Sequence, residues 1–100
     1  MKVFNRKTLQ DFWIKHSESK EQLNSWIYDV EHTDWKTTHD VKERYPKADI
    51  LKNNRIVFNI KGNSYRLIVK VEYDRKQVYI KFIGTHSEYD IVDANTVDMY

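Results

Sequence analysis

Residues 55–83 alternate apolar with other side chains at nearly every second position, and this pattern constrains the fold more than any other feature. Such alternation is typical of β-strands that bury one face. Gly62-Asn63 predicts a two-residue hairpin turn, since glycine suits the first central position of a type II′ turn. Residues 74–76 predict the next turn. The sequence therefore predicts a three-stranded antiparallel meander.

Helical spacing replaces strand spacing in the first third of the chain. Apolar side chains recur three and four residues apart over residues 6–16 and 19–32, which predicts two amphipathic helices after a short strand at residues 1–5. Ser19 is followed three positions later by Gln22, which predicts a capping box at the start of the second helix.

The remaining stretches are less regular. We expect Thr38 to cap a short helical turn that ends before Pro46, because proline cannot continue a helix. Residues 91–100 are acidic and are expected to form a partly ordered helix or tail. The order of elements predicts one α+β domain over residues 1–100, with N-terminal helices packed on one face of a small antiparallel sheet.

Side chains of a strand point alternately to the two faces of a sheet, so the alternation assigns each residue to a face. One predicted face is wholly uncharged and should be covered by the helices: Ile56, Phe58, Ile60, Tyr65, Leu67, Val69, Val71, Val78, Ile80 and Phe82. The opposite face should carry a cluster of polar and basic residues, namely Arg55, Asn59, Lys61, Arg66, Lys70, Tyr79 and Lys81. Neighbouring cations repel one another, and a polyanion would relieve that repulsion.

The charge distribution points to an anionic partner as well. Residues 36–81 carry twelve Lys or Arg and five Asp or Glu, whereas residues 82–100 carry four acids and no Lys or Arg. A basic central block favours an anionic ligand such as RNA, and arginine matches phosphate with a planar fork of donors. The simpler alternative is a solvated, lysine-rich surface.

Composition excludes several classes of protein. The chain has no cysteine and only two glycines, so a disulfide framework, thiolate chemistry and a glycine-rich phosphate loop are not expected. His16, His32 and His39 show no metal-ligand spacing, and no cofactor is expected. No apolar run approaches the roughly 18 residues that span a bilayer, and no signal peptide is evident, so we expect a cytoplasmic protein without a membrane partner.

His86 and Tyr89 follow the last predicted strand, where that strand meets the polar face. A histidine there can serve as a general acid or base near neutral pH, and a tyrosine can stack on a base. A lone histidine beyond a strand is also common as a cap or surface group. RNA cleavage by attack of the 2′-hydroxyl needs only cations at the phosphate and groups that accept and donate a proton, and these residue types suit it.

Two linked stretches carry a family resemblance. RIVFNIKGNSYR at residues 55–66 and IKFIGTHSEYD at residues 80–90 resemble the HigB family of type II toxin–antitoxin systems, which are distant relatives of RelE. The resemblance implies a RelE-like fold and a metal-independent endoribonuclease that cuts mRNA on translating ribosomes and leaves a 2′,3′-cyclic phosphate. It also implies a HigA-type helix-turn-helix antitoxin, through which the pair would bind operator DNA.

Motif positions then suggest roles for single residues. Arg55, Asn59 and Arg66 would line the RNA surface, with His86 and Tyr89 at the cleavage site. Lys81 stands where relatives often carry arginine, so it keeps the charge of a phosphate clamp without the bidentate fork.

The expected roles divide into two sets. The residues expected to act in catalysis are His86, Arg66, Tyr89 and Lys81. The residues expected to bind RNA are Arg55, Asn59, Lys61, Lys70 and Tyr79. Which residue is the general base stays open. Two alternatives also stay open: a non-catalytic RNA- or ribosome-binding module, and an adaptor whose basic face receives an acidic peptide.

Overall fold

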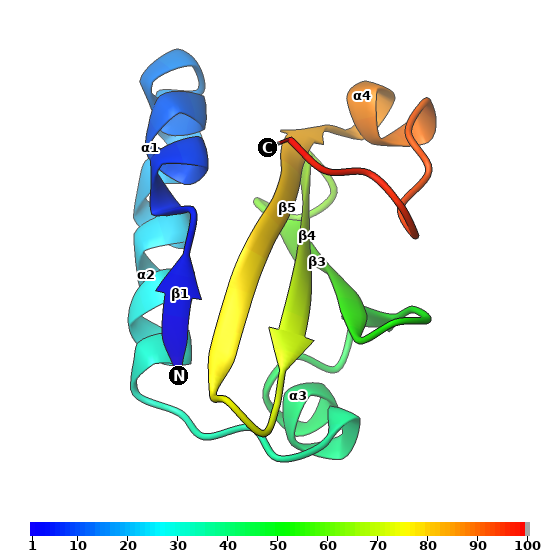
Figure 1. Ribbon diagram of the computed structural model, residues 1–100. Helices are drawn as coiled ribbons and strands as arrows, with labels where there is room; N and C mark the ends of the chain where they lie inside the picture. Colours follow the sequence, from blue (N-terminus) through cyan, green and yellow to red (C-terminus); the bar gives the residue numbers. More distant parts are fainter. Residues whose placement is uncertain (100) are drawn as a thin grey trace.

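The computed structural model describes residues 1–99 as a five-stranded sheet with helices on both sides (Figure 1). The elements are β1 (Lys2–Phe4), α1 (Arg6–Lys15), α2 (Lys20–Glu31), α3 (Thr38–Arg44), β2 (Asp49–Ile50), β3 (Arg55–Ile60), β4 (Tyr65–Glu72), β5 (Gln77–Thr85) and α4 (His86–Asp90). The strand order is β1-β5-β4-β3-β2, and only the β1–β5 pair is parallel. The predicted α+β fold class, with N-terminal helices packed on one face of a small antiparallel sheet, is confirmed, although β1 joins the sheet in parallel.

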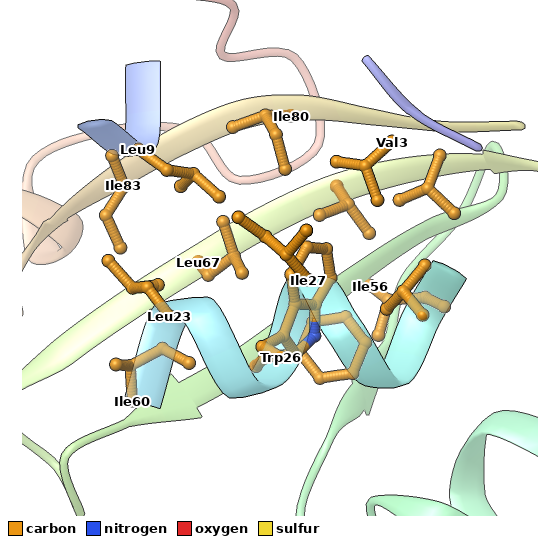
Figure 2. Close-up of a cluster of buried hydrophobic side chains, with 14 of the residues drawn as sticks. Val3, Leu9, Leu23, Trp26, Ile27, Ile56, Ile60, Leu67, Ile80 and Ile83 are labelled. Carbon is orange, nitrogen blue, oxygen red and sulfur yellow. The ribbon is translucent and has the colours of Figure 1, made fainter. Parts of the chain in front are cut away.

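The main core lies between the sheet and the helices α1 and α2 (Figure 2). Leu9 of α1 and Leu23, Trp26, Ile27 and Val30 of α2 are buried there, as the helical spacing predicted. They pack on the apolar side of the sheet, where nine of the ten predicted residues belong to this core. Burial of such side chains contributes about 1.5–3 kcal/mol each, so this core fixes the sheet in place.

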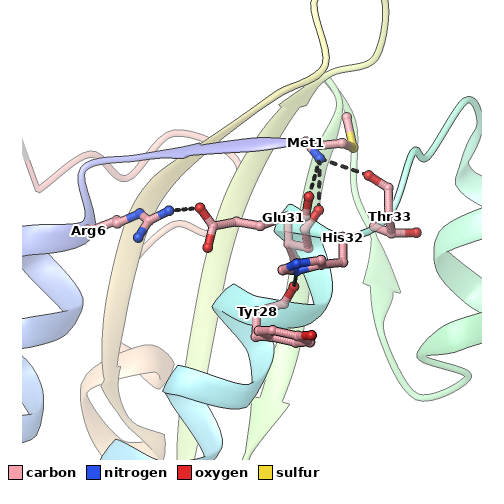
Figure 3. A network of polar contacts seen from close by, with 7 residues as sticks. Met1, Arg6, Tyr28, Glu31, His32 and Thr33 are labelled. Carbon is pink, nitrogen blue, oxygen red and sulfur yellow. Dashed lines mark hydrogen bonds and ion pairs between the residues drawn. The ribbon is translucent and has the colours of Figure 1, made fainter.

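The N-terminal strand is tied to the end of α2 (Figure 3). The Met1 amino group donates to the carbonyl oxygens of Val30 and Thr33 at 2.9 and 2.8 Å. Arg6 forms an ion pair with Glu31 close by. These contacts hold the start of β1 at the end of α2, and β1 pairs in parallel with β5, with Phe4 opposite Tyr79.

The predicted capping box of Ser19 and Gln22 and the predicted cap at Thr38 are wrong. Ser19 already has helical backbone angles after a 3-10 turn at Ser17–Ser19, and its hydroxyl donates to the His16 carbonyl at 2.7 Å. Gln22 instead accepts a hydrogen bond from the backbone of Lys61 at 2.6 Å. An extended backbone is what an N-cap residue requires, and for α3 it is found at Thr37 rather than Thr38.

The β3–β4 connection and the strand that precedes β3 also differ from the prediction. The β3–β4 connection is a four-residue loop from Lys61 to Ser64, because sheet pairing ends at Ile60 and Tyr65. Lys61 and Gly62 both have positive φ, at 54° and 63°, so the two-residue turn is wrong. The short strand β2 was not predicted. It consists of two residues, both paired with β3, and two residues are too few to show an alternating pattern.

A β-bulge at Lys81 changes the face assignment within β5. Val69 pairs with Ile80 and Ile68 pairs with Phe82, which leaves Lys81 without a partner in β4. Phe82 therefore joins Val57 and Ile68 in a second apolar cluster on the far side of the sheet, and Ile83 takes the core position. The prediction that Phe82 faces the helices is wrong for this reason.

We call the side of the sheet away from α1 and α2 the open face. α4 and residues 91–99 lie against this face (Figure 1). Val92, Ala94 and Val97 pack on the Phe82 cluster, so this segment covers the middle part of the open face. The predicted acidic tail also includes Tyr100, which lies outside the described residues. Among residues 1–99 no helix has the length and apolarity needed to cross a membrane.

Candidate functional site

The short helix α4 positions two of the predicted catalytic side chains. Thr85 caps it, with its hydroxyl accepting from the Glu88 backbone at 3.2 Å while the Glu88 carboxylate accepts from the Thr85 backbone at 2.8 Å. This backbone hydrogen bond from Thr85 holds the pKa of Glu88 below its ordinary value. The His86 backbone donates to the Ser64 carbonyl at 3.1 Å. His86 and Tyr89, three residues apart, then lie on neighbouring positions of one helical face.

Arg66 meets Tyr89 at the end of the sheet next to α4. The central carbon of the Arg66 guanidinium lies 5.7 Å from the centre of the Tyr89 ring, within the range of a cation–π contact. One guanidinium nitrogen, Nη1, donates to the Asn63 carbonyl at 3.1 Å. Within residues 1–99, Nε and Nη2 have no hydrogen-bond partner. The half-buried guanidinium is thus oriented by its neighbours while donors stay available for a phosphate.

His86 has an acidic partner one helical turn away. Its Nδ1 lies 3.1 Å from a carboxylate oxygen of Asp90, and its side chain is 51% exposed. When Nδ1 carries the proton and donates a hydrogen bond to Asp90, Nε2 is the basic nitrogen. An imidazole oriented by a carboxylate is the usual arrangement of a general base. Sequence reasoning did not select Asp90, although its spacing of four residues from His86 was a usable signal.

A second group of cations lies further along the open face. Lys70, Lys81 and Asp98 line a hollow of about 500 Å³ together with Arg55, Glu72 and three asparagines, Asn53, Asn54 and Asn95. Lys81 pairs with Asp98 at 3.0 Å, and Lys70 lies 3.8 Å from Glu72. Arg66 and Lys70 are four positions apart on β4, which corresponds to about 13 Å along the strand. The basic residues therefore form an elongated track rather than one cluster.

Arg55 does not have the exposed position predicted for it. Only 8% of the residue is exposed, and its Nη1 donates to the carbonyl oxygens of Ala94 and Val97 at 3.2 and 2.7 Å. The apolar cluster around Phe82 draws this segment onto the sheet, and its carbonyl groups then meet the guanidinium. Arg55 therefore anchors residues 94–97, and a phosphate clamp of Arg55, Arg66 and Lys81 together is not formed.

Asn59 and Lys61 differ from each other in placement. Asn59 lies directly opposite Arg66 on β4 and shares its face. Lys61 is exposed and lies in the β3–β4 loop, so its predicted place on the sheet face is wrong. The left-handed backbone at Lys61 ends the alternation one residue before the sequence pattern suggested.

The last two residues of interest are an aromatic and a glycine of β5. Tyr79 lies on the open face, half-buried, and donates a hydrogen bond to the Gln77 side chain at 2.6 Å. Gly84 pairs with Arg66, and a Cβ there would lie 2.6 Å from the tip of the Phe82 ring. Glycine thus lets Phe82 lie next to the Arg66–Tyr89 pair. Within residues 1–99 no three His, Cys, Asp or Glu side chains are grouped as metal ligands.

Comparison with known proteins places this geometry in context. Residues 19–92 match the sequence model of the HigB toxin family, which is described as the RelE-like toxic component of a toxin–antitoxin system. The chain is 28% identical over 96 residues to the mRNA interferase toxin HigB of Escherichia coli K12, covering 94% of this chain and 92% of that protein. It is 25% identical over 92 residues to mRNA interferase HigB of E. coli O6:H1, covering 90% and 89%. mRNA interferase HigB of Shigella flexneri is 28% identical over 96 residues, with 94% and 92% covered.

Proposed function

The chain belongs to the HigB family of RelE-like toxins, and we propose that it is an endoribonuclease that cleaves mRNA at the α4 end of its open sheet face. The family match confirms the resemblance carried by residues 55–66 and 80–90. The activity agrees with the names of its relatives, three of which are called mRNA interferases. Cleavage of messages would stop translation, which is how such a toxin arrests growth.

The observation that carries the assignment of the site is the pair of contacts at α4. Arg66 lies over Tyr89, and His86 lies beside Asp90, so a cation, an aromatic ring and an oriented imidazole come from one small region. These groups are what cleavage by the 2′-hydroxyl needs.

The proposed reaction proceeds by transfer within the RNA. The 2′-oxygen attacks the adjacent phosphorus while the bond from phosphorus to the 5′-oxygen breaks, giving a 2′,3′-cyclic phosphate and a 5′-hydroxyl. His86 accepts the proton of the 2′-hydroxyl at Nε2, and a solvent water molecule donates the proton that the leaving 5′-oxygen takes up. Arg66 neutralises the charge that builds up on the phosphate oxygens, and Tyr89 orients Arg66 and stacks on a neighbouring base. Lys81 and Lys70 bind phosphates further along the track.

Ribosomes programmed with a defined message give the direct test. Mapping of 5′ ends should reveal new ends with the unmodified protein and none above background with His86→Ala. His39→Ala is the matched control, because His39 also pairs with a carboxylate four residues on, Glu43 at 2.9 Å, but lies on α3. Cleavage by His86→Ala at the unmodified rate would contradict the site. A protein that binds ribosomes without producing any new ends would instead be a non-catalytic binding module.

Membership of a toxin–antitoxin family implies an antitoxin as partner. We propose that this partner is a HigA-type helix-turn-helix protein, that operator DNA is bound only through it, and that the toxin acts in the cytoplasm, where translated messages are found. An acidic antitoxin segment could cover the same cations that hold RNA. Co-expression with the adjacent reading frame should suppress the growth arrest, and a neighbour without a helix-turn-helix domain would contradict the HigA assignment.

A further inference from the structure

Two aromatic rings on the open face take no part in the proposed chemistry. Phe4 of β1 and Tyr79 of β5 lie opposite each other, with ring centres 4.9 Å apart and planes inclined by 15°. Both residues are half-buried, whereas their neighbours Val3 and Ile80 are buried in the main core. Because side chains alternate along a strand, the two stacked rings point to the side that carries Arg66 and Lys81.

Cations surround this stack. The Lys2 ammonium group lies 5.0 Å from the centre of the Phe4 ring, and the Lys81 ammonium group lies 6.0 Å from the centre of the Tyr79 ring. Lys70 stands directly opposite Tyr79 in the β4–β5 register. Glu72 and Asp98 pair with Lys70 and Lys81, while Lys2 has no ion pair within residues 1–99. The local charge of the lysines and acids just named therefore remains positive, which suits a phosphate chain.

Tyr79 is also held in place. Its hydroxyl donates to the Gln77 side chain at 2.6 Å, and its ring packs on Phe4, which the Met1 contacts hold at the edge of the sheet (Figure 3). A ring that is already ordered loses little conformational entropy when a ligand stacks on it. Stacked aromatic side chains and flanking cations on a sheet surface are the combination by which proteins bind single-stranded RNA.

We propose that Phe4 and Tyr79 form a stacking subsite for an unpaired base of the RNA, with Lys2, Lys70 and Lys81 at the adjacent phosphates. The base stacks on Phe4 or Tyr79 at an end of the pair where Lys2 or Lys81 now lies over the ring. That lysine then moves to an adjacent phosphate. The inference rests on the proposed function, and it adds Phe4 and Lys2, which lie outside both family motifs. Tyr79 is six residues from Thr85 on β5, or about 20 Å along the strand, so this nucleotide is remote from the scissile bond.

That distance determines which kinetic quantity the subsite controls. A contact remote from the reacting atoms strengthens binding in the ground state and the transition state equally, so it affects half-saturation and leaves the rate at saturation unchanged. Phe4→Leu and Tyr79→Leu keep apolar bulk but remove the flat π-face. Each should raise the half-saturating concentration for cleavage on programmed ribosomes by about tenfold, the effect expected for one base stack. Tyr79→Phe keeps the ring and should stay within about twofold of the unmodified protein.

A matched control is available on α2. Tyr28 is 64% exposed and stacks on His32 at 4.0 Å, on the helical side of the sheet. Tyr28→Leu should leave half-saturation unchanged. A message that carries 2-aminopurine, a fluorescent base whose emission falls on stacking, gives a readout that a merely structural effect would not move. Its quenching by the protein should be lost in Tyr79→Leu and retained in Tyr79→Phe.

The outcomes separate this inference from the proposed function. If the unmodified protein does not cleave RNA, the proposed function fails. If it cleaves and both leucine variants match it in half-saturation and quenching, the stacking subsite is wrong while the proposed function stands. If the leucine variants bind RNA normally but lose the antitoxin, the rings serve a protein partner and the inference is also overturned. If Phe4→Leu does not fold, the half-saturating concentration of Lys2→Ala and the 2-aminopurine quenching test the subsite instead.

Discussion

The Arg66 guanidinium lies over the ring of Tyr89, with its central carbon 5.7 Å from the ring centre. The two residues come from different elements, β4 and α4, and Gly84 pairs with Arg66 in the sheet, where a Cβ would lie 2.6 Å from the Phe82 ring and 3.2 Å from the Glu88 Cβ. The ring contact and the hydrogen bond from Nη1 to the Asn63 carbonyl restrict the guanidinium, so its remaining donors point in a defined direction. Orientation of a planar fork is what distinguishes arginine from lysine at a phosphate.

Substitution of Arg66 should therefore separate charge from geometry. Arg66→Ala removes a preorganised donor to the reacting phosphate and should lower the cleavage rate at saturation by about 10²–10³. Arg66→Lys keeps the charge without the fork and should recover only part of that loss. The measurement is single-turnover cleavage on programmed ribosomes, with Arg75→Ala in the exposed β4–β5 loop as control. Equal rates for Arg66→Lys and the unmodified protein would show that charge alone is sufficient.

Asp90 should act through His86 rather than on RNA. Asp90→Asn keeps the size of the side chain but removes the charge that favours a proton on Nδ1 and stabilises the imidazolium. We expect the cleavage rate to fall by about tenfold or more, with half-saturation unchanged. The same substitution in a His86→Ala background should have no further effect. Additive losses in the double variant would contradict a shared role.

Arg55 should be important for stability and not for RNA binding. Arg55→Met leaves the Ala94 and Val97 carbonyl groups without their charged donor, and loss of such bonds costs about 1.5–3 kcal/mol in the free energy of unfolding. Urea titration should show this loss, while Arg75→Ala should stay within about 0.5 kcal/mol.

Hydrogen exchange localises the effect of Arg55→Met. The Met99 amide, which donates to the Lys81 carbonyl at 3.0 Å, should exchange faster in this variant. Unchanged stability together with weaker RNA binding would mean that Arg55 contacts RNA after all.

The capping box of α4 predicts a pH dependence of stability. The backbone hydrogen bond from Thr85 lowers the pKa of Glu88 below its ordinary value of 4.5. Because the unfolded state then binds the proton more readily, this contribution to the free energy of unfolding is present above about pH 4.5 and is lost as the pH falls further. Glu88→Gln retains an acceptor that does not titrate. Urea titrations between about pH 3 and 7 should show a smaller decrease at low pH for this variant, and identical decreases would contradict the assignment.

The elements that the sequence predicted well are those with a local signal. Leu9, Leu23 and Trp26 face the core because helical spacing alone assigns them, and the alternation from Ile56 to Val71 locates two strands correctly. His86 and Tyr89 were selected as candidate site residues because they follow a strand end and form part of a motif, and their role stays a prediction. Each of these features is encoded within a few residues.

The features that were missed depend on distant contacts. The burial of Arg55 requires carbonyl groups 39 and 42 residues later in the chain, and no pattern around Arg55 indicates them. The bulge at Lys81 shifts the alternation by one residue, and the sequence Ile-Lys-Phe-Ile fits the pattern with or without that shift. Phe82 was therefore assigned to the wrong face. The pairing of Phe4 with Tyr79 joins the first strand to the last, which local alternation does not specify.

The bulge also determines on which side of the sheet α4 emerges. With one unpaired residue at Lys81, the segment from Phe82 to Thr85 runs half a period out of phase with Gln77–Ile80. In a β5 strand without this additional residue, Phe82 would point into the main core. Each later residue of the strand would also point to the opposite face. α4 would then leave the sheet toward α1, and His86 and Tyr89 would no longer share a surface with Arg66. A single inserted position thus decides whether the two halves of the site meet.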